Sequence, residues 1–308
     1  MVSQLFYRAY SPRSAGGLVS GKANQGWHRP SHINLEREFG NHKDLSNQNP
    51  TALVSVTSSI IRALNIAFNK HYRDDEKRAE IWIAFIESRI RNQMHGDQNP
   101  VYFKDEYLFE WGVPMEYVVH GVSVQTLVDR GLNMKEYRED TWIEHQHRWR
   151  EILPSTSNLR TKIANTVCDF TFGRKVHVYN SHDQFESHVR LAGMVRAFGV
   201  KALELNLLWE IFSNCCTGRF SSPRNFKQRY NAINEDCHEL LLDWWLLGDE
   251  FNYDYACHLE YAFHLQETMA ARWDELVKNG IDIYDDHTRC EEELEMFMEI
   301  EADAVTGL

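Results

Sequence analysis

Three short segments of the chain carry polar side chains of the kinds that bind phosphate groups and stabilise positive charge. They hold Arg8, the hydroxyls of Ser55, Thr57 and Ser58, and the carboxylate of Glu106. A guanidinium suits bidentate binding of a phosphate. A fixed carboxylate can stabilise a positive charge that develops during a reaction. The segments form one candidate site if the fold brings them together, although each alone is also typical of an ordinary surface charge or helix cap.

Each of these side chains is predicted to lie on a β-strand or at its end. Apolar and polar residues alternate in residues 4–10 and again in 101–110, which indicates strands. Residues 52–57 predict a strand that runs directly into a helix capped by Ser58 or Ser59. Residues 80–87 predict a buried strand. Within 101–124 we expect two paired strands joined by a Gly-Val-Pro turn, with Glu106 on the first.

The second half of the chain has a helical pattern. Residues 33–49 predict at most a short helical turn, residues 141–152 predict a helix, and residues 170–180 predict a hairpin or strand. Further helices are expected at 183–198, 201–215, 224–247, 253–279 and 289–304. The fold class is therefore α+β. We expect a mixed domain over residues 1–140 and a mostly helical domain over 141–308.

The ordered set of motifs in residues 4–125 resembles the ADP-ribosyltransferase fold of the arginine–serine–glutamate class. It is most similar to the fungal ADP-ribosyltransferase-like domains of uncharacterised function. The residues that carry the resemblance are Tyr7-Arg8, the run from Ser55 to Ser58, the run from Glu106 to Phe109, and Val113-Pro114. The resemblance implies a split β-sheet and does not extend to the helical half.

The resemblance also implies a reaction, in which NAD is the substrate and its nicotinamide–ribose bond is cleaved. The transition state is an oxocarbenium-like sugar, as in glycoside hydrolysis. Glu106 would stabilise it, Arg8 would anchor the pyrophosphate or ribose, and hydroxyls of Thr57 and Ser58, or else Ser55, would support the nicotinamide pocket. Tyr7 or Tyr10 would stack on the nicotinamide or pack the pocket.

Two positions depart from the pattern of the class. Val56 replaces the first serine of its Ser-Thr-Ser motif, and Lys104 replaces the Gln or Glu that engages the acceptor. The acceptor expected is a protein, but plain hydrolysis of NAD, transfer to another acceptor and a weakened enzyme stay open. The alternative from another class is a catalytically silent interaction module. The sequence predicts no oligomeric state.

Composition bounds these hypotheses. The net charge is −12, and the acidic excess lies in residues 141–308, which disfavours binding of a polyanion by that half. No signal peptide or spanning segment is expected, which predicts a cytoplasmic protein without a membrane partner. His145-x-His147 and Cys237-His238 match no zinc frame, so we expect no metal. Free thiols are expected at the six cysteines, which are Cys168, Cys215, Cys216, Cys237, Cys257 and Cys290.

Overall fold

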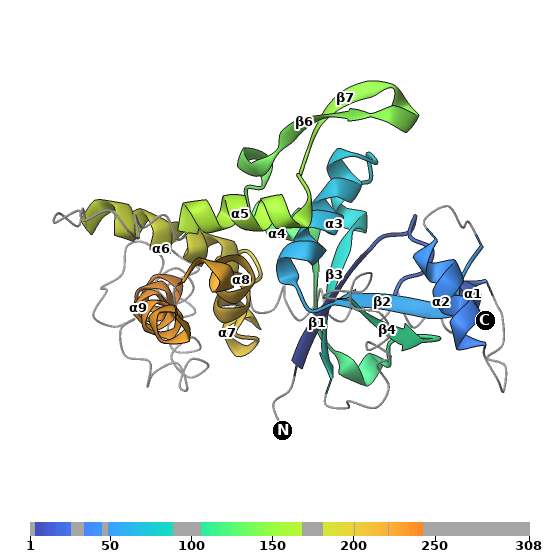
Figure 1. Cartoon of the computed structure of the whole chain (residues 1–308), viewed down its shortest axis with the longest axis horizontal. Helices are drawn as coiled ribbons and strands as arrows, with labels where there is room; N and C mark the ends of the chain where they lie inside the picture. Colours follow the sequence, from blue (N-terminus) through green and yellow to red (C-terminus); the bar gives the residue numbers. More distant parts are fainter. Residues whose placement is uncertain are drawn as a thin grey trace, which may run out of the picture. The chain divides into compact units, whose positions relative to one another are not determined.

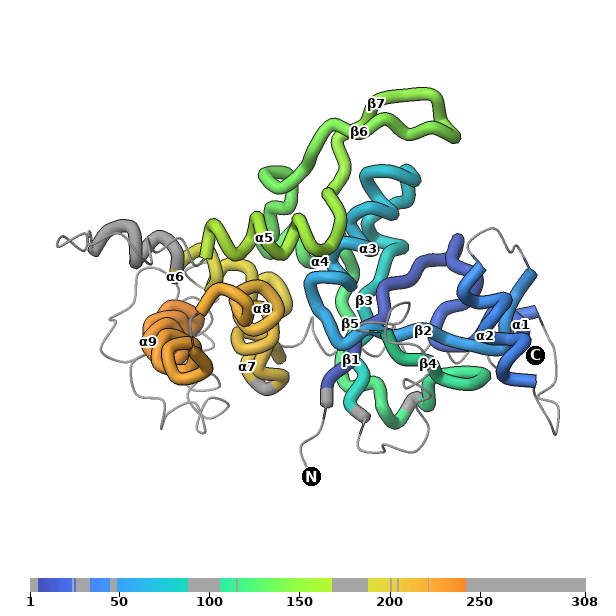
Figure 2. The backbone as a smooth tube through the Cα atoms, in the orientation of Figure 1, coloured from blue at the N-terminus to red at the C-terminus, as the bar shows by residue number. Residues whose placement is uncertain are grey.

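The computed structural model describes residues 4–25, 34–44, 49–88, 106–167, 181–199, 201–220 and 222–242. The chain forms two compact units (Figure 2). The described residues of the first unit lie within Met1–Thr126 and Arg138–Leu153, and those of the second lie within Leu127–Tyr137 and Pro154–Glu291. A sheet dominates the first unit and helices the second, so the α+β class is confirmed. Within the described residues, no helix is long and apolar enough to cross a membrane.

The first unit is built on a five-stranded antiparallel sheet with the order β4-β2-β1-β3-β5 (Figure 1). Its strands are β1 (Gln4–Tyr10), β2 (Leu53–Thr57), β3 (Trp82–Ser88), β4 (Glu106–Glu110) and β5 (Val118–Ser123). Strands β4 and β5 are opposite edges of this sheet, so the predicted pairing within 101–124 is wrong. The segment between them carries the chain from one edge to the other instead of forming a tight turn.

The central strands β1 and β2 of the sheet pair at only one position. Strand β1 pairs with β3 along its whole length, from Gln4 to Tyr10. Its register with β2 is the single pair Tyr7↔Thr57. Strands β2 and β4 then pair from Leu53 to Thr57. The sheet is thus two ribbons, β4-β2 and β1-β3-β5, that meet at one pair of residues and separate beyond it.

Both faces of the sheet are covered by apolar packing. Helix α3 (Ile60–Tyr72) begins after Ser59, whose hydroxyl accepts a hydrogen bond from the Arg62 amide at 3.2 Å, as predicted. Its buried stripe packs against β1 and β3. The opposite face carries a buried cluster that holds Phe6, Tyr10, Leu18, Val54, Val56, Trp82, Ala84, Ile86, Phe109, Val113 and Val118. Two helices precede β2, α1 (Gly21–Asn24) and α2 (Leu35–Lys43). Helix α2 is longer than the short turn expected there.

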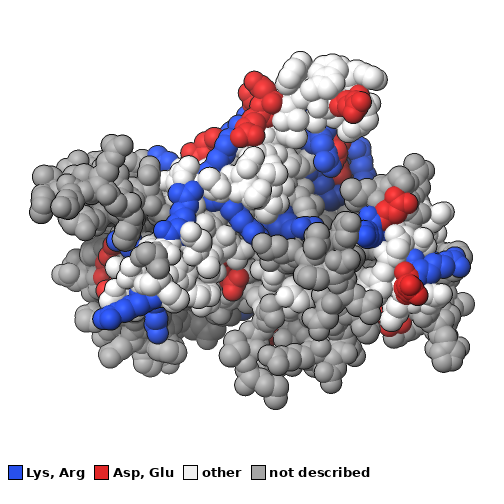
Figure 3. Space-filling model, in the orientation of Figure 1, with Lys and Arg blue, Asp and Glu red and all other residues white. Residues whose placement is uncertain are grey.

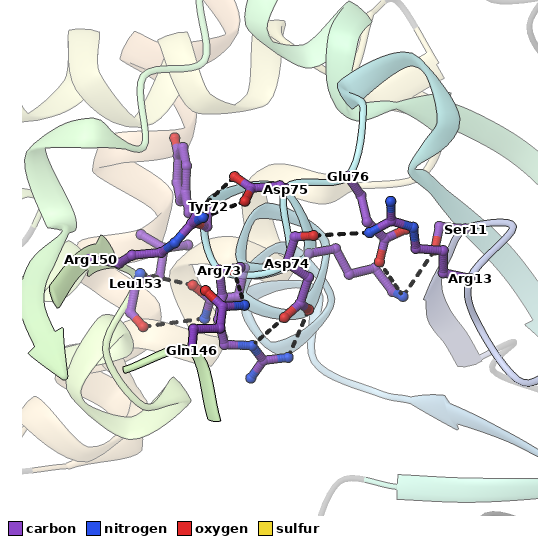
Figure 4. Close-up of polar contacts among 12 residues, drawn as sticks. Ser11, Arg13, Tyr72, Arg73, Asp74, Asp75, Glu76, Gln146, Arg150 and Leu153 are labelled. Atoms are coloured by element: carbon purple, nitrogen blue, oxygen red, sulfur yellow. Dashed lines mark hydrogen bonds and ion pairs between the residues drawn. The ribbon is translucent and has the colours of Figure 1, made fainter. Parts of the chain in front are cut away.

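Residues 141–152 form a β-hairpin, so the predicted helix is wrong. Strands β6 (Glu139–Ile143) and β7 (Arg148–Ile152) pair across a turn in which His147 has a φ of 49°. The Asn69 side chain donates to the Leu153 carbonyl at 3.2 Å and accepts from the Leu153 amide at 2.9 Å. Arg150 donates to the Tyr72 carbonyl at 2.7 Å (Figure 4). These contacts attach the hairpin to the end of α3.

The second unit is helical in its described part. Helix α4 (Val124–Asp129) leaves β5, and the helices that follow are α5 (Thr156–Val167), α6 (Ser181–Arg196), α7 (Lys201–Glu204), α8 (Leu207–Cys216) and α9 (Pro223–Leu242). The helices expected at 183–198 and 224–247 are confirmed over their described residues. The one expected at 201–215 is broken at Asn206, whose φ is 52°. The elements expected at 170–180, 253–279 and 289–304 lie outside the described residues.

Aromatic rings and thiols fill the interior of this helical unit. Trp209 contacts the rings of Phe226 and Tyr230 at centroid distances of 5.5 and 4.7 Å. Cys215 and Cys237 are free and buried, as expected. Cys216 is disulfide-bonded, so the expectation of a free thiol is wrong at that position.

The two hydrogen bonds between the Asn69 side chain and the Leu153 backbone can be tested by substitution. Asn69→Ala leaves the buried amide and carbonyl of Leu153 without their partner, which costs about 1–3 kcal/mol. We expect hydrogen exchange at the Leu153 amide to accelerate roughly tenfold or more, measured by NMR or mass spectrometry. Asn158→Ala, at an exposed position, is the control. Unchanged hydrogen exchange at the Leu153 amide in the Asn69 variant would show that these hydrogen bonds do not attach the hairpin to α3.

Candidate functional site

A small pocket of about 60 Å³ opens beside the point where β1 and β2 separate. It collects residues from β1, β2, α3 and β4, all within the first unit. The residues that line it are Tyr7, Arg8, Ala9, Ser55, Val56, Thr57, Arg62, Ile66 and Glu106. Arg8, Ser55, Thr57, Tyr7 and Glu106 were predicted from the sequence, and the fold brings them to one cavity.

Arg8 bridges the gap between the two ribbons of the sheet. Its guanidinium donates to the carbonyl of Ser55 on β2 at 2.6 Å, to that of Gly16 at 2.8 Å and to that of Gly17 at 2.5 Å. The backbone at Gly16 is tightly packed, since an added Cβ would lie 2.3 Å from the Val19 carbonyl oxygen. Three of the five guanidinium donors therefore satisfy main-chain carbonyls, and Arg8 fixes the shape of the pocket wall.

Glu106 begins β4 and faces the first turn of α3. It lies opposite Thr57 in the ladder, which sets its carboxylate beside the Ser-Val-Thr-Ser run. Its Oε2 accepts from the Arg62 guanidinium at 2.9 Å, and only 17% of the Glu106 side chain is exposed. The low exposure keeps the ion pair away from bulk water and strengthens it relative to a surface pair.

Arg62 and Ile66 were missed by sequence reasoning. They lie one helical turn apart on the face of α3 opposite its buried stripe, where a charged residue is usually only a solvated one. Ile66 is 38% exposed and lines the pocket, which gives the pocket an apolar wall. The available signal was an isoleucine in line with an arginine on the polar face of an otherwise amphipathic helix.

His42, near the end of α2, is a second residue that the sequence did not single out. Its Nε2 lies 4.0 Å from Glu106 Oε1, and its Nδ1 lies 3.1 Å from the Thr51 hydroxyl. Burial lowers the pKa of His42 below its ordinary value; Glu106 raises it and Arg8 lowers it further. A neutral imidazole at this position adds no positive charge to the carboxylate's surroundings.

The hydroxyls of the Ser-Val-Thr-Ser run divide between the pocket and the start of α3. Thr57 is buried and lines the pocket, and its hydroxyl accepts from the Ser59 amide at 3.1 Å. Ser55 lines the pocket and gives its carbonyl to Arg8. Ser58 is half-buried and is not one of the lining residues. The pocket therefore draws its hydroxyls from Thr57 and Ser55.

The predicted tyrosines and Lys104 differ in their relation to the pocket. Tyr7 is fully buried, packs edge-on against Phe85 and is one of the lining residues. Tyr10 belongs to the apolar cluster on the other face of the sheet and is not a lining residue. Lys104, predicted on the acceptor side, lies outside the described residues.

A second and larger pocket, of about 480 Å³, shares Arg8 and Ser55 with the first. Most of the residues that line it are polar, and two are glycines. It includes Gly16, Asn41, His42, Asp44, Asn49 and Thr51. Arg8 and Ser55 thus form part of the wall of both cavities.

The described residues contain no group of three or more His, Cys, Asp or Glu side chains arranged to hold a metal ion. Comparison of the chain with models of protein families, with the sequences of curated proteins and with solved structures found no match. The function is therefore argued from the site itself.

The coupling between Glu106 and His42 gives a test that needs no ligand. Glu106→Gln removes the larger of the two carboxylate charges that raise the His42 pKa, while burial and Arg8, which lower that pKa, stay in place. We expect the His42 imidazole to titrate at a lower pH in this variant, measured by NMR of its ring protons. Glu110→Gln, on the same strand, is the matched control. An unchanged His42 titration in Glu106→Gln would contradict the geometry of the site.

Proposed function

We propose that the chain cleaves the nicotinamide–ribose bond of NAD, as a mono-ADP-ribosyltransferase or an NAD glycohydrolase. The observation that carries the proposal is the convergence of Arg8, Thr57 and Glu106 on one pocket. These residues come from three strands and are far apart in the sequence. Together they offer a guanidinium, a hydroxyl and a shielded carboxylate, which are the groups that the reaction requires.

The chemistry assigns a role to each group. The bond between the ribose C1′ and the nicotinamide nitrogen breaks, and its electron pair leaves with the nicotinamide. The ribose becomes oxocarbenium-like and is then attacked by water or by a nucleophile of the acceptor. Glu106 stabilises the positive sugar and accepts a hydrogen bond from the ribose 2′-hydroxyl. The apolar wall at Ile66 and the buried ring of Tyr7 suit the flat nicotinamide.

The two arginines of the pocket suit the anionic part of the same substrate. Arg62 is 37% exposed and pairs with Glu106, whereas Arg8 is committed to three carbonyls. Arg62 is thus the better placed anchor for a pyrophosphate. Pyrophosphate bound to Arg62 would replace the Glu106 carboxylate as its partner and release Glu106 for the ribose. The adjoining polar pocket has room for the adenosine end.

Substitution of the proposed catalytic carboxylate is the direct test. Glu106→Gln keeps the shape of the side chain and removes its charge, so nicotinamide release should fall on the order of 10²–10³-fold. The release is measured by chromatography after incubation of the full chain with NAD. Glu110→Gln is the control, because Glu110 lies on the same strand and outside the pocket lining. Activity that survives Glu106→Gln would remove Glu106 from the mechanism.

The second candidate function is a catalytically silent module that uses the transferase-like fold for interaction. The Arg62–Glu106 ion pair favours it, because a paired carboxylate is a weaker stabiliser of an incoming cation. Calorimetric titration with NAD separates the two functions. An enzyme of the proposed kind binds NAD, with weaker binding after Arg62→Leu. Absence of any binding heat, with no nicotinamide released, would favour the silent module.

A further inference from the structure

The outer face of the β6–β7 hairpin is an exposed aromatic surface. Trp142 and Trp149 are cross-strand partners whose ring centroids lie 5.8 Å apart, with an interplanar angle of 62°. They are 45% and 67% exposed. Among the described residues the only other large hydrophobic side chain so exposed is Ile66, which lines the pocket described above. Tryptophan is rarely left in solvent without a use, so this pair requires a reason.

Carboxylates flank the tryptophan pair on the same face. Side chains alternate across a strand, so Asp140 and Glu151, which are paired two positions further along, point the same way as the indoles. Directly opposed like charges destabilise a hairpin. Glu151 receives a 2.9 Å contact from Arg138, whereas Asp140 has no ion-pair partner among the residues that the structure describes. We call Asp140, Trp142, Trp149 and Glu151 the tryptophan–carboxylate face.

Two basic residues of the hairpin, Arg148 and Arg150, are turned to its other face, whereas Arg138 stays beside Glu151. Arg148 contacts Asp75 at 2.9 Å, and Arg150 binds both oxygens of the same carboxylate (Figure 4). Asp75, at the end of α3, thus holds both guanidiniums against the body of the first unit. The surface view shows uncharged side chains at the end of the hairpin, with acidic side chains beside them (Figure 3). The exposed face is therefore aromatic and acidic.

We propose that the tryptophan–carboxylate face binds an arginine- or lysine-rich segment of a partner protein. Indole faces attract guanidinium and ammonium groups, and carboxylates complete the recognition by charge-assisted hydrogen bonds. The same carboxylates repel nucleic acid and anionic lipid. A two-fold contact with a second copy would bring Asp140 and Glu151 against their own equivalents, which disfavours self-association. A cationic segment would supply Asp140 with the ion-pair partner that it lacks among the described residues.

The binding is measured with the full chain and two fluorescent peptides, one alternating arginine with serine and one alternating glutamate with serine. Fluorescence anisotropy should show binding of the arginine peptide that weakens with salt, and none of the glutamate peptide. Trp142→Ser/Trp149→Ser and Asp140→Asn/Glu151→Gln should each weaken it on the order of tenfold. Both pairs are on the surface, so circular dichroism melting should show a folded protein.

The matched control is Glu80→Gln/Glu116→Gln, which removes two exposed carboxylates from the same unit outside the hairpin. If this control lost as much binding as the Asp140/Glu151 variant, the binding would depend on net charge alone, and the proposal would be overturned. Retained binding in the tryptophan variant would also overturn it, as would no binding of the arginine peptide at millimolar concentration. A dimer in light scattering that the tryptophan variant abolishes would instead make the face a self-contact. NAD cleavage is assayed in parallel and should be unchanged by these substitutions.

Discussion

The structure of the first unit depends on the hydrogen bonds of one guanidinium. Strands β1 and β2 pair at Tyr7 and Thr57 and then separate, and Arg8 fills the resulting gap by donating to carbonyls on β2 and on the Gly16–Gly17 backbone. Without it, one carbonyl on β2 and two in the loop after β1 would lose this donor, at a cost of about 1–3 kcal/mol for each that is buried. The pocket exists because the sheet is open here, and it keeps its form because Arg8 joins the two sides.

The electrostatics of the pocket differ from those of the chain. The whole sequence has a net charge of −12, yet two guanidiniums and one carboxylate line this cavity. A local positive excess in an acidic protein favours a small anionic ligand that can enter a cavity over an extended polyanion that must contact the surface. Glu106 limits that excess, and its shared position between Arg62 and His42 fixes its orientation. The same contacts that orient the carboxylate also compete with any substrate for it.

Local patterns in the sequence predicted the individual strands and the helix cap of the site. They did not predict which strands lie side by side or which side chains contact one another. Strands β1 and β2 and the Ser59 cap follow from alternation and from cap chemistry. The pairing of β4 was wrong, because which strand lies beside which is decided by packing across the whole sheet. Residues 141–152 include helix-forming glutamates and glutamine, but two contacts with α3 favour a hairpin. The backbone of Leu153, which follows the hairpin, binds the Asn69 side chain, and Arg150 donates to the Tyr72 carbonyl. Arg62 could not be chosen, since a polar helix face looks the same with or without a pocket beside it.

The first unit cannot be excised as one continuous segment that ends before the hairpin. The first unit is discontinuous, because residues 127–137 belong to the second unit and Arg138–Leu153 to the first. The sequence suggests a boundary at residue 140. A fragment that ended there would keep α3 but would lose Arg150 and Leu153, which form hydrogen bonds with Tyr72 and Asn69 of that helix. Asn69 and Asp75 would then face solvent, and the buried side of Ile143 would be missing. The smallest fragment that retains these contacts continues through Leu153 and carries the intervening segment as an insertion.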